Sequence, residues 1–270
     1  MQITHVISLE TPELQPYRTL RRPLEHQQRG IFVAEGEKVV RRLLESKLET
    51  ISALLTPEWL SVYTTLLENK GEGLRVFVAD KRLLESIVGF HLHQGIMAVA
   101  KIPKPSTLDD VLASATRPYL FVAVDGLTNA ENLGVLVRNC AAFGVQGLIV
   151  GETSSSPYLR RSVRNSMGTV FRLPVVHPTS LIQALMDMHT KYGIRTIAAH
   201  PHVTGTELNR AKFTNDCCIV FGSEGGGISP GVLAACDEAV AIPMKEGVDS
   251  LNVASATAVL LYEVQRQRRL

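Results

Sequence analysis

A glycine-rich segment in the C-terminal part of the sequence carries its most distinctive chemistry. The apolar run Cys217–Phe221 leads directly into Gly222-Ser223-Glu224-Gly225, so that one carboxylate stands among glycines and serines. Glycines leave backbone N–H and C=O groups open to a ligand, because no side chain covers them. No Gly-Lys-Ser/Thr follows, and the Gly-x-Gly-x-x-Gly pattern is missing from the position that a dinucleotide site requires. The segment therefore predicts a ligand-binding loop of neither of these two types.

A second polar pair lies on a helix that is predicted directly after a buried strand. The run Tyr119–Val124 is typical of a strand covered on both faces of a parallel sheet, and residues 132–143 are predicted to be helical. Asn132 is well placed to cap this helix, whose N-terminus is a natural anion site. Arg138 follows six residues later, so simple helical spacing does not put it on the face of Asn132. An ordinary capped helix with a surface arginine has the same pattern.

Two shorter segments complete the set of candidate functional residues. Ser250-Leu251-Asn252 precedes a long terminal helix predicted at 253–268, and either Ser250 or Asn252 can cap that helix. Ser166-x-Gly168 comes just before a strand predicted at 170–175 and also fits a plain turn. Capping and function are compatible, so neither segment decides between them alone.

The elements that would position these residues alternate between strand and helix. In the C-terminal part we expect further strands at 147–150, 195–199, 217–221 and 238–242, with helices at 159–166 and 180–189. This alternation is typical of a mostly parallel sheet with helices on both faces, where ligands sit at the carboxyl ends of the strands. The N-terminal part also alternates, with strands expected at 30–34, 51–55, 75–78 and 95–100 and helices at 36–46 and 58–68. Pro103 and Pro105 predict a linker between two domains, residues 1–105 and 106–270.

Together, the segments resemble the three motifs of the SpoU/TrmH family of RNA ribose 2′-O-methyltransferases, in the SPOUT superfamily. The residues that carry the resemblance are Asn132-x-Gly134-x-x-x-Arg138, Ser166-x-Gly168, Gly222-Ser223-Glu224-Gly225 and Ile242-Pro243-Met244 through Ser250-Leu251-Asn252-Val253. Asn129-Ala130-Glu131 replaces the more usual Asp-Pro-x before Asn132, which changes the stiffness of this loop. The stretch Ile31–Gly36, with a second stretch at 94–99, is similar to the family's substrate-binding domain.

This resemblance implies an α/β protein with an N-terminal L30e-like α/β domain that binds the RNA substrate. It implies a C-terminal SPOUT domain with a mostly parallel sheet and a deep trefoil knot. The family works as a homodimer with the active site near the interface, where the apolar stripe of the terminal helix would pack, although it also suits packing on its own domain. S-adenosylmethionine would be the methyl donor. The positions that match the family's cofactor site are Phe221, Gly222, Ser223, Gly225, Ile242, Met244 and Leu251.

The residues that match the family's functional positions are Asn132, Arg138, Glu224, Ser250 and Asn252. A ribose hydroxyl is a poor nucleophile until its proton leaves, so the site must position it in line and ease its deprotonation. Arg138 is often assigned as the base in this family, but a guanidinium scarcely loses its proton in proteins. We therefore interpret Arg138 as a cation that grips an RNA phosphate and stabilises the developing alkoxide. Glu224 would orient Arg138 or neighbouring polar groups, and Ser250 and Asn252 would shape the loop and bind ribose or phosphate.

Composition bears on the core, the state of the cysteines and metal binding. The chain has 270 residues, of which 45% are hydrophobic, so it can build a core without disulfides. Its four cysteines show no zinc spacing, and we expect them to be reduced, in a cytoplasmic protein without a signal segment or a membrane span. The pairs His91/His93 and His200/His202 find no third ligand of suitable spacing, so no metal is expected.

The target RNA is the least determined part of this prediction. A net charge of +2 does not by itself demand a nucleic acid. The type of N-terminal domain favours ribosomal RNA over transfer RNA. The alternatives are a transfer RNA ribose methyltransferase, a SPOUT enzyme that methylates a base, and an RNA-binding relative that has lost catalysis.

Overall fold

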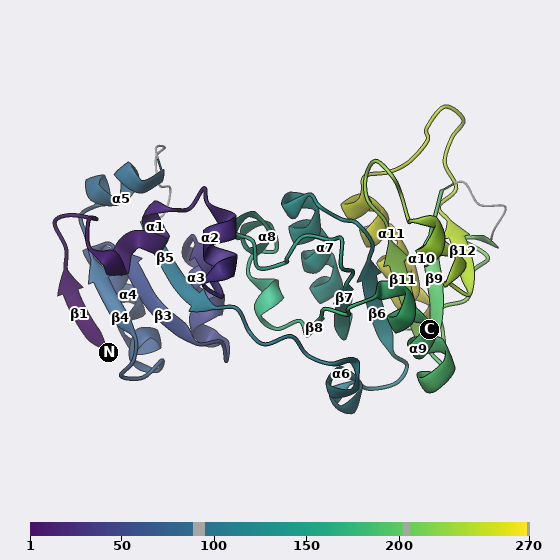
Figure 1. Ribbon diagram of the computed structural model, residues 1–270, viewed down its shortest axis with the longest axis horizontal. Helices are drawn as coiled ribbons and strands as arrows, with labels where there is room; N and C mark the ends of the chain where they lie inside the picture. Colours follow the sequence, from purple (N-terminus) through teal and green to yellow (C-terminus); the bar gives the residue numbers. More distant parts are fainter. Residues whose placement is uncertain (89–94, 202–205, 269–270) are drawn as a thin grey trace. The chain divides into compact units, whose positions relative to one another are not determined.

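The computed structural model describes residues 1–88, 95–201 and 206–268 and divides into two compact units (Figure 1). The first unit contains Met1–Lys104 and Tyr158–Arg172, and the second contains Pro105–Pro157 and Leu173–Leu270. The predicted C-terminal domain, 106–270, therefore has to be corrected for one segment. Tyr158–Arg172 lies in the second half of the sequence, but its contacts are with the first unit.

The first unit is built on a five-stranded mixed sheet in the order β1-β4-β3-β5-β2. Strands β1, β4 and β3 are parallel, and β5 is antiparallel to both β3 and β2. The strands are β1 (Gln2–His5), β2 (Ile31–Glu35), β3 (Thr50–Leu55), β4 (Arg75–Val78) and β5 (Ile96–Lys101). The helices are η1 (Pro12–Leu14), α1 (Gln15–Arg18), α2 (Pro23–Gln28), α3 (Glu37–Glu45), α4 (Pro57–Glu68), α5 (Lys81–Val88), α8 (Arg160–Asn165) and η2 (Thr169–Phe171), where η marks a 3₁₀ helix.

The second unit is built on a seven-stranded sheet in the order β10-β12-β9-β11-β6-β7-β8, and all neighbouring strands are parallel. The strands are β6 (Leu120–Val124), β7 (Gly147–Val150), β8 (Val175–Val176), β9 (Arg195–Ala199), β10 (Thr206–Glu207), β11 (Cys217–Phe221) and β12 (Glu238–Ala241). The helices are α6 (Leu108–Ser114), α7 (Ala130–Ala142), α9 (Leu181–Tyr192), α10 (Pro230–Ala234) and α11 (Val253–Arg268).

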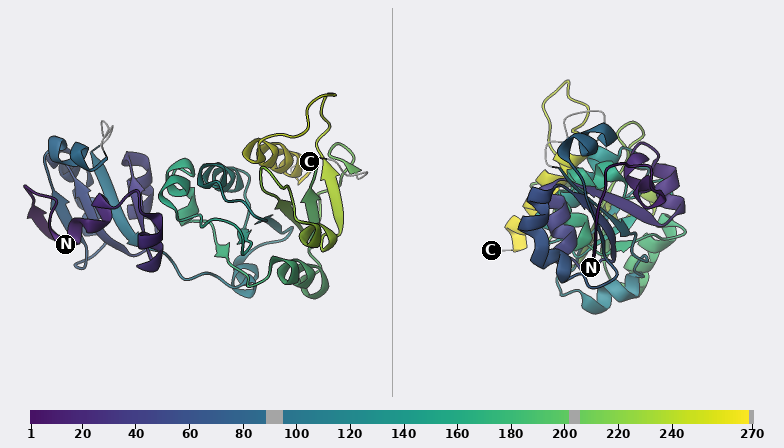
Figure 2. Two further views of the ribbon diagram at one scale, coloured as in Figure 1. Left: turned by 45° about the horizontal axis from the view of Figure 1, so that its top comes forward. Right: turned by 90° about the vertical axis from the view of Figure 1, so that its left-hand side faces the viewer.

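Helices cover both faces of this parallel sheet, as Figure 2 shows. Helices α6, α9 and α10 pack on one face, where Phe121, Ala123, Cys218 and Val220 enter a common apolar core. Helices α7 and α11 pack against each other on the other face. Every residue of the neighbouring strands β6 and β11 is buried, which explains their continuous apolar sequences. The predicted α/β class with a mostly parallel sheet is confirmed.

One predicted strand is wrong, and several short elements were not predicted. The strand expected at 170–175 is the 3₁₀ helix η2 followed by β8, which contains only Val175 and Val176. The reason is local: Gly168 is left-handed (φ 76°) and starts a tight turn, and Pro174 has no N–H to give to a sheet. The elements that sequence reasoning missed include β1, α5, α6, β10 and α10. The trefoil knot and the L30e-like fold stay predictions.

Within the described ranges, no helix combines the length and apolar character that a membrane span requires.

Candidate active site

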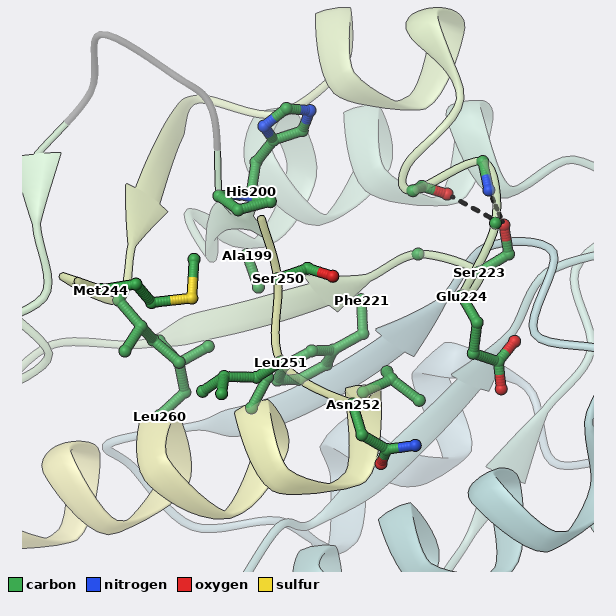
Figure 3. A pocket seen from close by; sticks show the side chains of 18 of the residues that line it. Ala199, His200, Phe221, Ser223, Glu224, Met244, Ser250, Leu251, Asn252 and Leu260 are labelled. Carbon is green, nitrogen blue, oxygen red and sulfur yellow. Dashed lines mark hydrogen bonds between the residues drawn. The ribbon is translucent and has the colours of Figure 1, made fainter. Parts of the chain in front are cut away.

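A cavity of about 440 Å³ opens in the second unit at the carboxyl ends of β9, β11 and β12. This is the edge where parallel α/β sheets bind their ligands. Most of the predicted site residues line it (Figure 3), whereas Asn132 and Arg138 do not. The predicted residues at the cavity are Phe221, Gly222, Ser223, Glu224, Gly225, Ile242, Met244, Ser250, Leu251 and Asn252.

The glycine-rich loop closes on itself directly after β11. The Ser223 N–H donates to the Gly227 carbonyl at 2.9 Å, and the Gly227 N–H donates back to the Ser223 carbonyl at 3.0 Å. The Ser223 hydroxyl accepts a further bond from the Gly226 N–H at 3.1 Å (Figure 3). A Cβ on Gly222 would lie 2.1 Å from the Gly227 carbonyl carbon and 2.3 Å from the Ile228 nitrogen. Only glycine fits at residue 222, because the two backbone segments of the loop approach each other there.

Asp125 holds both ends of this loop, a role that sequence reasoning missed. The Asp125 N–H donates to the Phe221 carbonyl at 2.8 Å, where the loop begins. The Asp125 carboxylate accepts from the Ser229 N–H at 2.7 Å, where the loop ends. Asp125 is 8% exposed, so water competes little for these bonds. The available signal was a lone acid at the end of a fully apolar strand.

Three polar side chains of the predicted set form one directed chain of hydrogen bonds. At the start of α11, the Ala254 N–H donates to Asn252 Oδ1 at 2.9 Å. Asn252 Nδ2 then donates to Asn132 Oδ1 at 3.1 Å, and Asn132 Nδ2 donates to Glu224 Oε1 at 2.5 Å. The backbone donor fixes which atom of Asn252 is the acceptor, and each amide fixes the next. The chain ends on the carboxylate, whose second oxygen, Oε2, accepts from neither asparagine.

The capping prediction for Asn132 is wrong, and the correction explains how it can join this chain. Helix α7 begins at Ala130, two residues earlier than expected, and Asn129 is its N-cap, accepting from the N–H groups of Glu131 and Asn132. The Asn132 side chain is therefore available for Glu224 and Asn252. The prediction that Asn252 can cap the last helix is confirmed by its bond to Ala254.

Arg138 lies apart from the other predicted residues. It is exposed on α7, six residues and therefore about 9 Å of helix rise beyond Asn132. Its guanidinium makes no hydrogen bond or ion pair within the part of the chain that the structure describes. Of the two partners predicted for Glu224, the structure has the neighbouring polar group, Asn132, and not Arg138.

Thiol chemistry does not fit this site. Burial raises the pKa of Cys217 to about 11 and that of Cys236 to about 12, so both thiols stay protonated at neutral pH. Cys140 and Cys218 are fully buried, and burial raises the pKa of both thiols. All four cysteines are free; Cys140, Cys217 and Cys218 are buried and Cys236 is half-buried.

Of the four histidines in the two predicted pairs, the structure describes only His200. His200 lines the cavity next to Ala199 (Figure 3), while His91, His93 and His202 lie outside the described residues. Among the residues that are described, no group of three or more His, Cys, Asp or Glu side chains is arranged to hold a metal ion.

Comparisons with known proteins first define the class. The chain resembles the crystal structure of the SpoU methyltransferase AviRb from Streptomyces viridochromogenes, in complex with AdoMet, with a TM-score of 0.82, 25% identity, and coverage of 96% of this chain and 99% of that one. It also resembles a solved RNA 2′-O ribose methyltransferase with a TM-score of 0.78, 27% identity, and coverage of 99% and 100%. The fold is that of the SpoU and TrmH RNA methyltransferases.

Sequence comparison then gives the family. The model of the SpoU rRNA Methylase family matches residues 119–262. An uncharacterized tRNA/rRNA methyltransferase of Mycobacterium tuberculosis is 31% identical over 274 aligned residues, covering 98% of this chain and 93% of the relative. The chain belongs to the SpoU family of RNA methyltransferases.

Proposed function

We propose that this protein transfers the methyl group of S-adenosylmethionine to a ribose 2′-hydroxyl of RNA, and that the RNA is ribosomal. The observation that carries the proposal is the chain of hydrogen bonds from Asn252 through Asn132 to Glu224 at a cavity of about 440 Å³. The likeness to an RNA 2′-O ribose methyltransferase supports ribose as the acceptor, and the family model supports ribosomal RNA.

The cavity fits S-adenosylmethionine in size and in chemistry. Its volume is within the range of small-molecule sites, and a glycine-rich backbone lies beside apolar side chains. Leu251 is 40% exposed at the cavity, which leaves an apolar surface for a flat base to cover. Phe221, Ile242 and Met244 would contribute further apolar contacts, while Gly222, Ser223 and Gly225 would contribute backbone groups. When bound, this donor supplies a methyl group on a sulfonium sulfur that is already activated for transfer.

The polar residues of the chain would act on the acceptor. Glu224 Oε1 is engaged by Asn132, so the other carboxylate oxygen can accept a hydrogen bond from the ribose hydroxyl and orient it. Asn252 holds Asn132 in place, and Ser250 lies at the same cavity. Arg138, exposed and without a partner among the described residues, would bind an RNA phosphate away from the cavity.

We further propose that the protein works as a homodimer. Helix α11 buries Leu260, Leu261 and Val264 in its own unit, yet it leaves Val259 40% exposed and Tyr262 59% exposed. These two side chains are three residues apart and therefore share one face of the helix. A second copy covering this face would remove an apolar surface from water. The free thiols and the RNA substrate favour the cytoplasm as the place of action.

Methyl transfer from labelled donor to deproteinised ribosomal and transfer RNA, followed by nucleoside analysis, tests the function. A 2′-O-methylnucleoside from ribosomal RNA is the expected product. Label in transfer RNA alone would move the substrate to that class, and a methylated base would overturn the ribose assignment. Calorimetry with S-adenosylmethionine separates these outcomes from a silent RNA-binding protein, which would bind no donor. Ribose-methylation mapping in cells with and without the gene locates the nucleotide.

A further inference from the structure

The segment Tyr158–Arg172 has an unusual composition for the place where it packs. Its 15 residues include four arginines and no acid, namely Arg160, Arg161, Arg164 and Arg172. It contains the Ser166-x-Gly168 motif, whose residues do not line the cavity. The segment belongs to the first unit, although strands β7 and β8 of the other unit flank it in sequence.

Specific contacts hold the segment on the first unit. The Phe32 ring of β2 lies 5.5 Å from the Tyr158 ring and 5.4 Å from the Phe171 ring, measured between centroids. Arg42 of α3 donates from Nη1 to the Met167 carbonyl at 2.5 Å. Met167 has a φ of +54°, which non-glycine residues rarely adopt, so the Arg42 bond supports a strained turn. The fold therefore fixes where these arginines lie.

Helix α3 contributes further cations to the same place. Together they form a basic surface, which we define as Lys38, Arg41, Arg42, Arg160, Arg161, Arg164 and Arg172. The carboxylates of these elements are Glu35, Glu37 and Glu45. Seven cations thus face three carboxylates, a local excess of positive charge that the overall net charge of +2 conceals.

Two carboxylates of this surface are each shared by two guanidinium groups. Glu35 lies 3.2 Å from Arg160 and 3.9 Å from Arg164, so two guanidinium groups share one carboxylate. Glu45 is shared in the same way by Arg41 at 3.0 Å and Arg172 at 3.8 Å. Each guanidinium has five N–H donors, and the side chains of Arg164 and Arg172 are 59% and 72% exposed. The exposed pairs that Glu45 makes with Arg41 and Arg172 add little to stability, whereas the largely buried Arg160–Glu35 pair also serves the fold.

We propose that the basic surface binds the phosphate backbone of the substrate RNA and holds it for methylation. This inference rests on the proposed function, because RNA is the polyanion that the enzyme must hold. Planar guanidinium groups match phosphate geometry, and release of counterions from RNA adds to affinity. The second motif is then a phosphate-binding segment anchored on the first unit.

The test compares two double variants with the wild-type protein. Arg164→Gln/Arg172→Gln removes two exposed charges of the basic surface, and Arg82→Gln/Arg210→Gln removes two exposed charges elsewhere. Affinity for deproteinised ribosomal RNA is measured over a series of salt concentrations, together with S-adenosylmethionine affinity and thermal unfolding. We expect the first variant to reduce the salt slope by roughly 2, about one for each phosphate that is no longer bound, and to bind RNA roughly 10-fold more weakly. The control should retain the wild-type slope.

Two outcomes separate this inference from the proposed function. If both double variants bind RNA with the same affinity and salt slope, the basic surface is not the RNA site, whatever the methylation assay shows. If only the first variant loses RNA affinity while the wild-type protein methylates no RNA, the surface assignment stands and the proposed activity fails. Where methylation is measured, the KM for RNA should rise with kcat retained at saturating RNA. An Arg164→Lys/Arg172→Lys variant keeps the charge and should recover most of the affinity.

Discussion

At the scale of single residues, the site depends on the orientation of two amides. Asn132 accepts from Asn252 and donates to Glu224, so its oxygen and its nitrogen have separate partners. An asparagine can do both, whereas an aspartate of the same shape can only accept. The motif predicted from sequence that Asn132 belongs to the site, but not its bonds, because its partners lie 92 and 120 residues away.

Asn132→Asp should therefore be more damaging than its small change in shape suggests. The new carboxylate would face Glu224 without a proton to donate, and the two like charges would repel each other. We expect kcat to fall by about 100-fold, with the affinity for S-adenosylmethionine within a few-fold of wild type. Single-turnover methylation and donor calorimetry check this. Asn132→Ala serves as the control for removal of the amide without a new charge, and full activity in the aspartate variant would show that the bond to Glu224 is not needed.

At the scale of elements, the glycine-rich loop is a short closed turn whose two ends meet at Asp125. The bonds at Phe221 and Ser229 restrain the loop independently of any ligand. Sequence reasoning found the strand before the loop and the terminal helix by their apolar patterns, and the loop itself by its glycines. It could not find the restraint, because a hydrogen bond between an acid and a backbone group 104 residues away leaves no periodic signal.

Asp125→Ala should loosen this loop and weaken donor binding. Removal of the carboxylate removes its part-buried hydrogen bond with the Ser229 N–H, and a hydrogen bond to a charged group contributes about 1.5–3 kcal/mol to stability. We expect S-adenosylmethionine to bind roughly 10-fold more weakly, corresponding to about 1.4 kcal/mol. Asp125→Asn retains an acceptor oxygen and should recover part of the stability and part of the donor affinity. If a folded Asp125→Ala protein binds S-adenosylmethionine with wild-type affinity, the restraint of the loop by Asp125 does not matter for donor binding.

Helix α11 supports a second prediction at this scale. Tyr262→Glu places a charge in the centre of the apolar face that we assign to the dimer, and a buried unpaired charge is strongly unfavourable. We expect the protein to change from dimer to monomer, as light scattering would show. Val62→Glu, at a neutral side chain that is 67% exposed on α4, is the matched charge change. A Tyr262→Glu protein of unchanged mass would place the interface elsewhere or show that there is none.

At the scale of the whole molecule, the sequence predicted the larger part of both sheets. Strands such as Arg75–Val78, Gly147–Val150 and Cys217–Phe221 have the predicted bounds, because apolar runs between turns are local signals. The membership of Tyr158–Arg172 in the first unit was not predictable in this way. It depends on Phe32 meeting two aromatic rings from more than 100 positions further along the chain.

The stability of the first unit should depend on pH through His26. Burial lowers the pKa of His26, which is 5% exposed and shares a hydrogen bond with the Thr19 hydroxyl. The unfolded chain therefore takes up a proton at His26 more readily than the folded chain. Its contribution to stability is present above pH about 6.5, the unfolded value, and is lost as the pH falls through the lower folded pKa. Urea unfolding at pH 7.5 and 5.5 should show a smaller loss on acidification for His26→Gln, and an equal loss would exclude this histidine.

The return of residues 158–172 to the first unit limits how the protein can be divided or recombined. Along the chain, the path changes unit three times, after Lys104, Pro157 and Arg172, so the first unit is not one continuous stretch of sequence. A fragment ending at Lys104 lacks Tyr158 and Phe171 and would leave Phe32 without two ring partners. A chimaera that exchanges only residues 1–104 between relatives would combine a foreign α3 with a native Met167 turn. Transfer of the intact first unit between relatives therefore requires both stretches to be grafted together.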